Sequence, residues 1–205
     1  MNRKIGLYSA WVNATAVLAF AVYMLADASF GCYFASMFIA LSFVTMMCAF
    51  AHDAPPERRT AGYAAVAFAA VYAAIILLVY FAQLTAVRTG GLTEQARALL
   101  DFQQMGLFFS YDLLGYALMS LATLFAGLTL RPQTRAERWL RALLCIHGVF
   151  FIACLLIPLL GVFQPGRPTW VGVLVLEVWC AYFCPVSVLS ARWFRARPEK
   201  SALSE

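Results

Sequence analysis

Two carboxylates, Asp112 and Glu177, have the setting in this sequence that most suggests chemistry. Each lies inside a long apolar segment, and they are the only formally charged residues within the six such segments of the chain. A charged side chain inside a bilayer is costly, so it normally faces a polar partner, a water-filled cavity or a ligand. Both residues are therefore functional candidates.

A third polar side chain lies at a similar depth. Each carboxylate is seven residues from the predicted outer end of its segment, or roughly 10 Å at 1.5 Å per residue, and Gln83 is close to the outer end of the third segment. We therefore predict an outward-facing ligand pocket between helices three, four and six. Its predicted contact residues are Gln83, Asp112, Glu177, Tyr80, Tyr116 and Trp170. The alternative is a structural lock, in which each carboxyl group is protonated, or is hydrogen-bonded to a tyrosine or to Gln83, and joins helices together.

His147 is the candidate for other chemistries. An intramembrane lipid hydrolase would need a hydroxyl within hydrogen-bonding reach of such a base, and Thr45 or Ser42 could supply it. The sequence has no Gly-x-Ser-x-Gly elbow, however. His147 with Cys180 and Cys184 would be an incomplete metal site, since such sites normally need more ligands at a clear spacing. We expect no metal and no cofactor.

The amino-acid composition indicates that these residues lie in a membrane protein and not in a water-soluble one. Hydrophobic residues make up 63% of the chain and charged residues 12%, whereas soluble domains have about 45–50% and about 25%. The net charge of +5 comes from basic residues in short loops, which is typical of membrane anchoring and does not predict nucleic-acid binding. All six cysteines lie in or beside apolar runs, so we expect no disulfide framework.

Six segments are long enough to cross a bilayer as helices. We predict an all-α, polytopic transmembrane bundle that forms a single domain over 1–205. The expected spans are about 5–26, 32–51, 61–87, 105–130, 139–163 (apolar over 142–163) and 170–191, with a cytoplasmic tail over 196–205.

Smaller features refine this picture. Thr134 and Glu137 match a capping box that would begin the fifth helix, and Pro158 and Pro185 predict kinks. Between helices three and four, the segment 88–104 has an apolar face and predicts a short external amphipathic helix.

The basic residues predict the orientation. With the N-terminus inside, twelve of the fifteen lysines and arginines fall on the cytoplasmic side. Because positive residues concentrate in cytoplasmic loops, we expect a multi-pass protein of the bacterial inner (plasma) membrane with both termini in the cytoplasm.

Three stretches carry a resemblance to known proteins. They are Tyr80-Phe-Ala-Gln-Leu-Thr-Ala-Val-Arg88, the run 114–126 and Glu137-Arg-Trp-Leu-Arg141. In these the chain resembles a group of uncharacterised bacterial six-span membrane proteins, which implies an architecture and no activity. In length and topology it is also similar to the substrate-binding subunits of energy-coupling-factor transporters, although none of their ligand-binding motifs is present. Fold-level similarity of this kind does not determine function.

These observations favour a binding protein over an enzyme. We expect an integral membrane protein that binds, or also transports, a small or amphipathic molecule. Membrane lipids are its expected surroundings, and a second copy or another membrane subunit is a candidate partner. An intramembrane enzyme acting on a lipid and a scaffold or subunit of a membrane complex are the two alternatives.

Overall fold

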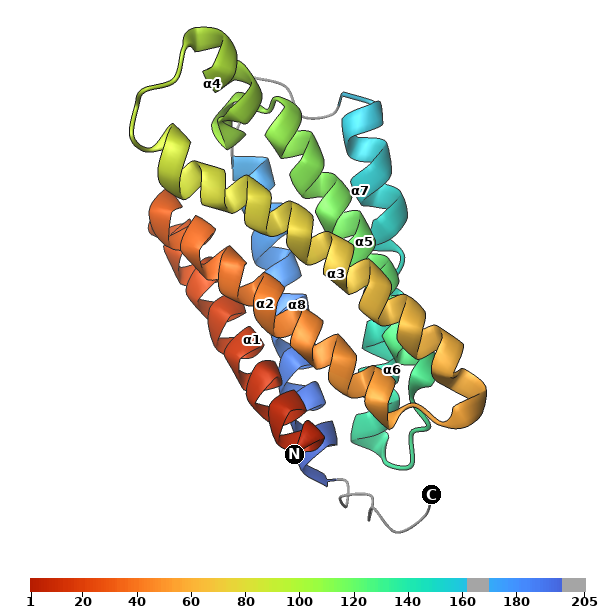
Figure 1. Cartoon of the computed structure of the whole chain (residues 1–205). Helices are drawn as coiled ribbons and strands as arrows, with labels where there is room; N and C mark the ends of the chain where they lie inside the picture. Colours follow the sequence, from red (N-terminus) through yellow and green to blue (C-terminus); the bar gives the residue numbers. More distant parts are fainter. Residues whose placement is uncertain (162–169, 197–205) are drawn as a thin grey trace.

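The protein is a bundle of long helices, described here from a computed structural model that covers residues 1–161 and 170–196. The long helices are α1 (Asn2–Leu25), α2 (Ser29–Asp53), α3 (Arg59–Ala82), α5 (Leu107–Thr129) and α8 (Trp170–Ala196) (Figure 1). The shorter ones are α4 (Glu94–Leu100), α6 (Arg135–His147) and α7 (Phe150–Leu159), with single turns at Pro56–Arg58, Gln83–Val87 and Phe102–Gln104.

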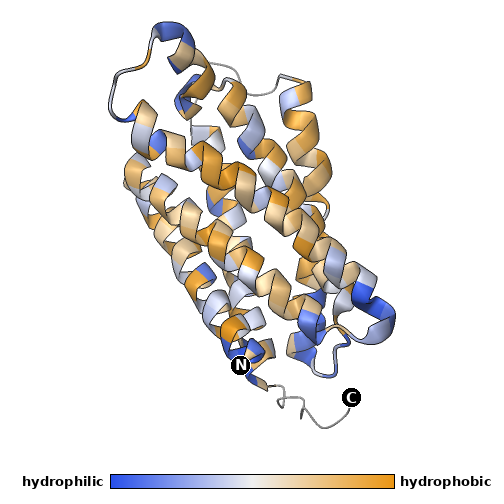
Figure 2. Ribbon diagram, in the orientation of Figure 1, coloured by the Kyte–Doolittle hydropathy of each residue, from blue (hydrophilic) through white to orange (hydrophobic). Residues whose placement is uncertain are grey.

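Six helical segments are long and apolar enough to cross a membrane. They are Asn2–Leu25, Ser29–Asp53, Pro56–Val87, Leu107–Thr129, Arg135–Leu159 and Trp170–Ala196. The prediction of a six-span, all-helical membrane protein is confirmed to this extent, and the described residues include no strand. Apolar residues cover the flanks of the bundle, and strongly polar ones gather at its two ends (Figure 2). This is the distribution that a lipid bilayer requires.

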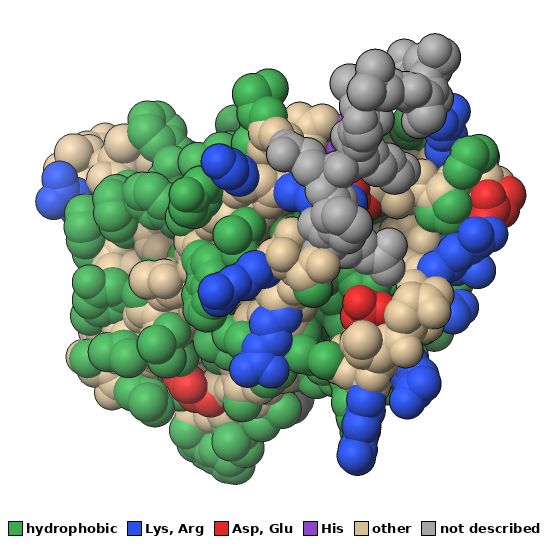
Figure 3. Space-filling model, turned by 90° about the horizontal axis from the view of Figure 1, so that it is seen from below, with side chains coloured by type: hydrophobic (Ala, Val, Ile, Leu, Met, Phe, Trp, Pro, Cys, Tyr) green, Lys and Arg blue, Asp and Glu red, His purple; other side chains and the backbone are tan. Residues whose placement is uncertain are grey.

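The two ends of the bundle are easily told apart. The start of α1 and the end of α8 lie together at one end (Figure 1), which we call the terminal end. There the ring centroids of Phe50 in α2 and Phe194 in α8 are 4.7 Å apart. Lysine and arginine side chains are spread over this face (Figure 3). The opposite end carries α4 (Figure 1) and is called the α4 end.

Small residues let the helices approach closely near the terminal end. Helix α1 packs against α2 and α8, while α3 packs between α2 and α5. A Cβ atom added to Gly6 would lie 2.7 Å from the Cβ atom of Ala49 and 2.9 Å from the Phe194 ring. A larger residue could not be placed there without moving a helix.

Asn13 joins three helices at the centre of this packing. The side chain is fully buried, and its amide group donates to the carbonyl oxygen of Ile39 at 3.0 Å and to the Ser42 hydroxyl at 2.9 Å. Its own oxygen accepts a hydrogen bond from Ser187 at 2.8 Å. We call Asn13, Ser42 and Ser187 the asparagine network. It satisfies the buried amide completely and fixes α1, α2 and α8 relative to one another.

The fifth span is not the single helix that the sequence predicts. Helix α6 ends at His147 and α7 begins at Phe150, so the break lies at Gly148 and not at Pro158, which is inside α7. Around the break the amides bond to carbonyl groups three residues back, as in Gly148 to Cys145 and Phe151 to Gly148. Glycine is a poor helix former, and burial of the His147 side chain holds the end of α6 in place. The capping box of Thr134 and Glu137 is present as predicted.

The segment between α3 and α5 contains the predicted short helix. Helix α4 begins after Thr93, whose hydroxyl accepts a hydrogen bond from the Ala96 amide at 3.3 Å. Ala96 and Leu100 are half-buried, whereas Leu99 is exposed. That this helix lies on the external membrane surface stays a prediction.

Candidate ligand-binding cavity

A cavity of about 710 Å³ lies in the α4 half of the bundle. Its walls come from the turn between α1 and α2, the first turns of α2, the 102–105 segment, α5, α7 and the first half of α8. Helix α7 packs against α5, while α8 packs against α1 and α6, so the space between the α7 and α8 walls is not closed by direct helix packing. The cavity extends from the α4 end down to His147.

Asp112 is the buried charge that faces this cavity. It lies on α5 and is 5% exposed. The Tyr80 hydroxyl donates to its carboxylate and is also hydrogen-bonded to the hydroxyl of Tyr116. The Oδ1 atom of Asp112 is buried and has no hydrogen-bond partner. A buried acceptor without a partner is costly, so this carboxylate is only half satisfied by the protein.

Aromatic side chains surround the carboxylate. Tyr116 and Trp179 meet edge to face with ring centroids 5.5 Å apart, and Phe102 and Phe109 meet in the same way at 5.2 Å. Tyr33 packs against Phe102 at 6.1 Å. All five line the cavity. The walls are therefore largely apolar, with π-faces and ring edges close to Asp112.

His147 forms the floor of the cavity and is fully bonded. The indole nitrogen of Trp179 donates to Nε2 at 3.1 Å, and Nδ1 is 2.8 Å from the Thr123 hydroxyl. An indole N–H can only donate, so Nε2 carries the lone pair and Nδ1 the proton. The Thr123 hydroxyl in turn donates to the Ser120 carbonyl at 2.8 Å. His147 is neutral in this arrangement and joins α5, α6 and α8.

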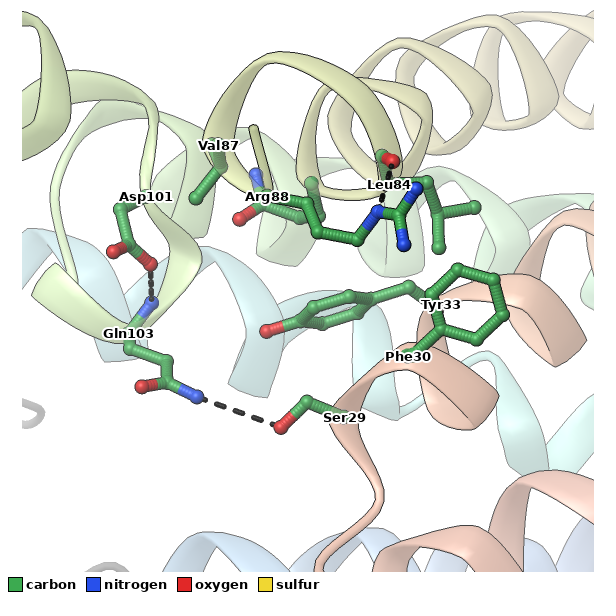
Figure 4. A pocket seen from close by; sticks show the side chains of 9 residues that line it. Ser29, Phe30, Tyr33, Leu84, Val87, Arg88, Asp101 and Gln103 are labelled. Carbon is green, nitrogen blue, oxygen red and sulfur yellow. Dashed lines mark hydrogen bonds between the residues drawn. The ribbon is translucent and has the colours of Figure 1, made fainter. Parts of the chain in front are cut away.

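A smaller pocket of about 220 Å³ adjoins the cavity at the α4 end. Ser29, Tyr33 and Gln103 line both spaces. Figure 4 shows Gln103 reaching toward Ser29, with a separation of 3.5 Å, below the Arg88 side chain. The Arg88 guanidinium carbon lies 5.5 Å from the centre of the Phe30 ring. This pocket is the polar neighbour of a mainly apolar cavity.

Gln83 lines the smaller pocket but not the wall of the main cavity. It is 3% exposed, and its amide nitrogen donates to the Leu100 carbonyl at 2.8 Å while its oxygen accepts from the Phe102 amide at 3.0 Å. Gln83 thus attaches the α4 segment to the end of α3. More broadly, no residue of α3 lines the cavity, because Tyr80 lies behind Asp112. The walls expected from helix three come instead from α2 and α7.

Of the other predicted contact residues, some lie at the cavity and others do not. Tyr116 lines the cavity with Asp112, whereas Tyr80 contacts Asp112 from behind. Glu177 is half-buried on α8 and is absent from the cavity wall. Its Oε1 atom is buried without a partner, and the carboxylate lies near Cys32 and Cys180. Trp170 is 64% exposed. The two acidic residues therefore do not form one shared pair.

The catalytic pair considered from the sequence is not formed. The Thr45 hydroxyl donates to the carbonyl of Leu41 in its own helix at 3.0 Å, and Ser42 belongs to the asparagine network. Both nitrogens of His147 are already occupied. Among the described residues, no group of three or more histidine, cysteine and acidic side chains is placed to hold a metal ion.

Several lining residues were not among the predicted contacts. Cys32, Tyr33, Phe109, Cys154 and Trp179 all contribute to the wall. Helix periodicity had placed Phe109 on the same face as Asp112, since it is three residues earlier. The others come from helices whose rotation is set by tertiary packing, for which hydropathy gives no signal.

Comparison of the chain with protein-family models, with curated proteins and with solved structures gives no match.

Proposed function

We propose that the protein binds a small amphipathic molecule in the cavity beside Asp112, and moves it across or presents it at the membrane. The observation that carries this proposal is a cavity of about 710 Å³ with aromatic walls and a buried carboxylate oxygen that has no partner. Small-molecule sites are typically about 300–1,000 Å³ and mainly apolar, with a few convergent polar groups. The cavity has this size and this character.

Burial of Asp112 argues for a ligand over a structural lock. A lock would use both oxygens of the carboxylate to join helices, as Asn13 uses its whole amide group. Here one oxygen is bonded to Tyr80 and the other is directed to no protein group. Charged residues in membrane helices usually mark the paths of ions or substrates, and a ligand would complete the set of hydrogen bonds.

The proposed direction of access is from outside the cell. The excess of lysine and arginine residues at the terminal end supports a cytoplasmic position for that end, and the cavity and the smaller pocket then lie on the external side. Apolar residues exposed on α7 and on the start of α8, including Ile152, Leu159 and Leu174, would contact membrane lipids.

The proposal is tested by filling the cavity. Ala153 lines it from α7, whereas the neighbouring Ile152 is exposed and is not part of the wall. In lipid nanodiscs, wild-type protein and the control variant Ile152→Trp should unfold at higher temperature when a twelve-carbon amphiphile is added. The test set is dodecylamine, dodecyltrimethylammonium, dodecanol and dodecanoate.

Ala153→Trp should lose this stabilisation, because the indole would occupy the space of the ligand. If none of the four compounds stabilises wild-type protein, or if the two tryptophan variants respond alike, the cavity is not a binding site for this class of molecule.

A further inference from the structure

We infer that the ligand of the cavity is an amphipathic amine, whose ammonium group binds Asp112 while its hydrocarbon part lies along the apolar wall. This inference rests on the proposed binding function and specifies the chemistry of the molecule bound. It follows from three features of the wall: the acceptor left free, the sign of the charges and the aromatic surroundings.

The first feature is the demand for a donor. Asp112 lines the cavity from α5, and its Oδ1 atom is buried and has no hydrogen-bond partner. A carboxylate in its ionised form only accepts hydrogen bonds. The ligand group that satisfies it must therefore carry an N–H or an O–H, and a charged donor makes the stronger bond.

The second feature is the sign of the charges on the wall. The described residues that line the cavity include two acidic side chains, Asp27 at the α4 end and Asp112 deeper inside, and no lysine or arginine. His147 is neutral because Nε2 accepts from Trp179. An anionic head group would find no cationic partner among these residues and would be repelled by the ionised Asp112. A cation would be attracted at short range in a medium of low dielectric constant.

The third feature is the aromatic shell. Tyr33, Phe102, Phe109, Tyr116 and Trp179 all line the same cavity as Asp112. Aromatic faces attract cations electrostatically, and clusters of them are the usual recognition surface for organic ammonium groups. The same rings offer an apolar surface for a hydrocarbon chain. One wall therefore suits both parts of an amphipathic amine.

The four amphiphiles separate these contributions in wild-type protein. Dodecylamine supplies both a positive charge and a hydrogen-bond donor. Dodecyltrimethylammonium supplies the positive charge without a donor, and dodecanol supplies a donor without charge. Dodecanoate carries the opposite, negative charge. We expect dodecylamine to bind most tightly and dodecanoate most weakly in nanodiscs of neutral lipid. Binding can be measured by thermal stabilisation, with Ala153→Trp as the blank.

Removal of the charge gives the sharper test. Asp112→Asn keeps the size of the side chain and a hydrogen-bonding group for Tyr80, but it loses the ion pair with the amine. The affinity for dodecylamine should fall by about tenfold to a hundredfold, the range for a charge-assisted hydrogen bond, and the affinity for dodecanol should change little. Glu177→Gln is the matched control, since Glu177 is the other carboxylate within the predicted apolar segments and does not line the cavity.

The outcomes distinguish this inference from the binding function itself. The inference of an amine ligand would be overturned if dodecanoate bound as tightly as dodecylamine, or if Asp112→Asn left the dodecylamine affinity unchanged. The cavity would then be one that accepts amphiphiles in general. If wild-type protein and the Ala153→Trp variant instead bind the amphiphiles equally well, the binding function itself is overturned. If Asp112→Asn does not fold, the order of affinities of the four compounds for wild-type protein still determines which head-group charge the cavity prefers.

Discussion

The terminal half and the α4 half of the bundle treat their buried polar residues in opposite ways. In the terminal half, Asn13 makes three hydrogen bonds to two other helices and leaves no polar atom of its amide without a partner. In the α4 half, Asp112 lines a cavity, with one oxygen bonded to Tyr80 and the other buried without a partner. The two residues are nearly the same size, so the difference lies in what surrounds them.

The helices are also packed more tightly in the terminal half than in the α4 half. At the terminal end, small residues bring α1 close to α2 and α8, and the second half of α8 includes fully buried residues such as Phe183 and Val186. Toward the α4 end, neither α7 nor the first half of α8, over 170–178, has a fully buried residue. We conclude that the terminal half supplies the stable frame and the α4 half the binding site.

The strongest test of the frame is Asn13→Leu. This change keeps the number and branching of the side-chain heavy atoms but removes three hydrogen bonds, and it leaves Ser187 without its interhelical acceptor. We expect a loss of about 2–4 kcal/mol in the free energy of unfolding, measured by steric trapping in bicelles. Thr45→Val, which removes only a bond to the same helix, should change it by less than about 0.5 kcal/mol. If the two variants lost the same free energy of unfolding, the role of Asn13 in joining three helices would be contradicted.

His147→Phe should have the next largest effect. The side chain is 1% exposed, and its loss leaves the Trp179 indole and the Thr123 hydroxyl without their partner. We expect destabilisation by about 1–3 kcal/mol in the same assay, because these bonds join α5, α6 and α8. Ile146→Phe, at an exposed neighbouring position, is the control. A stable His147→Phe protein would mean that the floor of the cavity is held by ring packing alone.

Gln83→Leu should act locally and more weakly. Without bonds to Leu100 and Phe102, the α4 segment would separate more often from the end of α3. Amides over 94–104 should exchange hydrogen faster by about tenfold, equivalent to roughly 1.4 kcal/mol, while global unfolding changes little. Thr85→Val serves as the control, since Thr85 bonds only to the carbonyl of Phe81. Unchanged exchange over 94–104 would show that other contacts hold this segment.

The sequence was sufficient for the framework but not for the site. Segment length and hydropathy predicted six membrane helices, because a bilayer imposes both on any chain that spans it. Asp112 was identified for the same reason: a carboxylate in an apolar run is unusual wherever it occurs. The break at Gly148 was missed, since apolar composition continues through it and Pro158 is the more obvious signal.

Depth along a helix was predicted better than rotation about it. Gln83, Asp112 and Glu177 were placed at one level from residue counts, which depend only on the helical rise. Which neighbour each side chain faces depends on how the helices are turned by their contacts. Gln83 faces the 100–102 segment and Glu177 lies near Cys32, so only Asp112 lines the cavity.

The most direct test of the division between frame and site is the thermal unfolding of Asp112→Asn in nanodiscs, with and without dodecylamine. A carboxylate kept for a ligand adds little to the stability of the empty protein. The variant should therefore unfold at the wild-type temperature or above it, and only wild type should be stabilised further by the amine. A variant that unfolds well below wild type, and responds to dodecylamine as wild type does, would show that Asp112 holds helices together like Asn13.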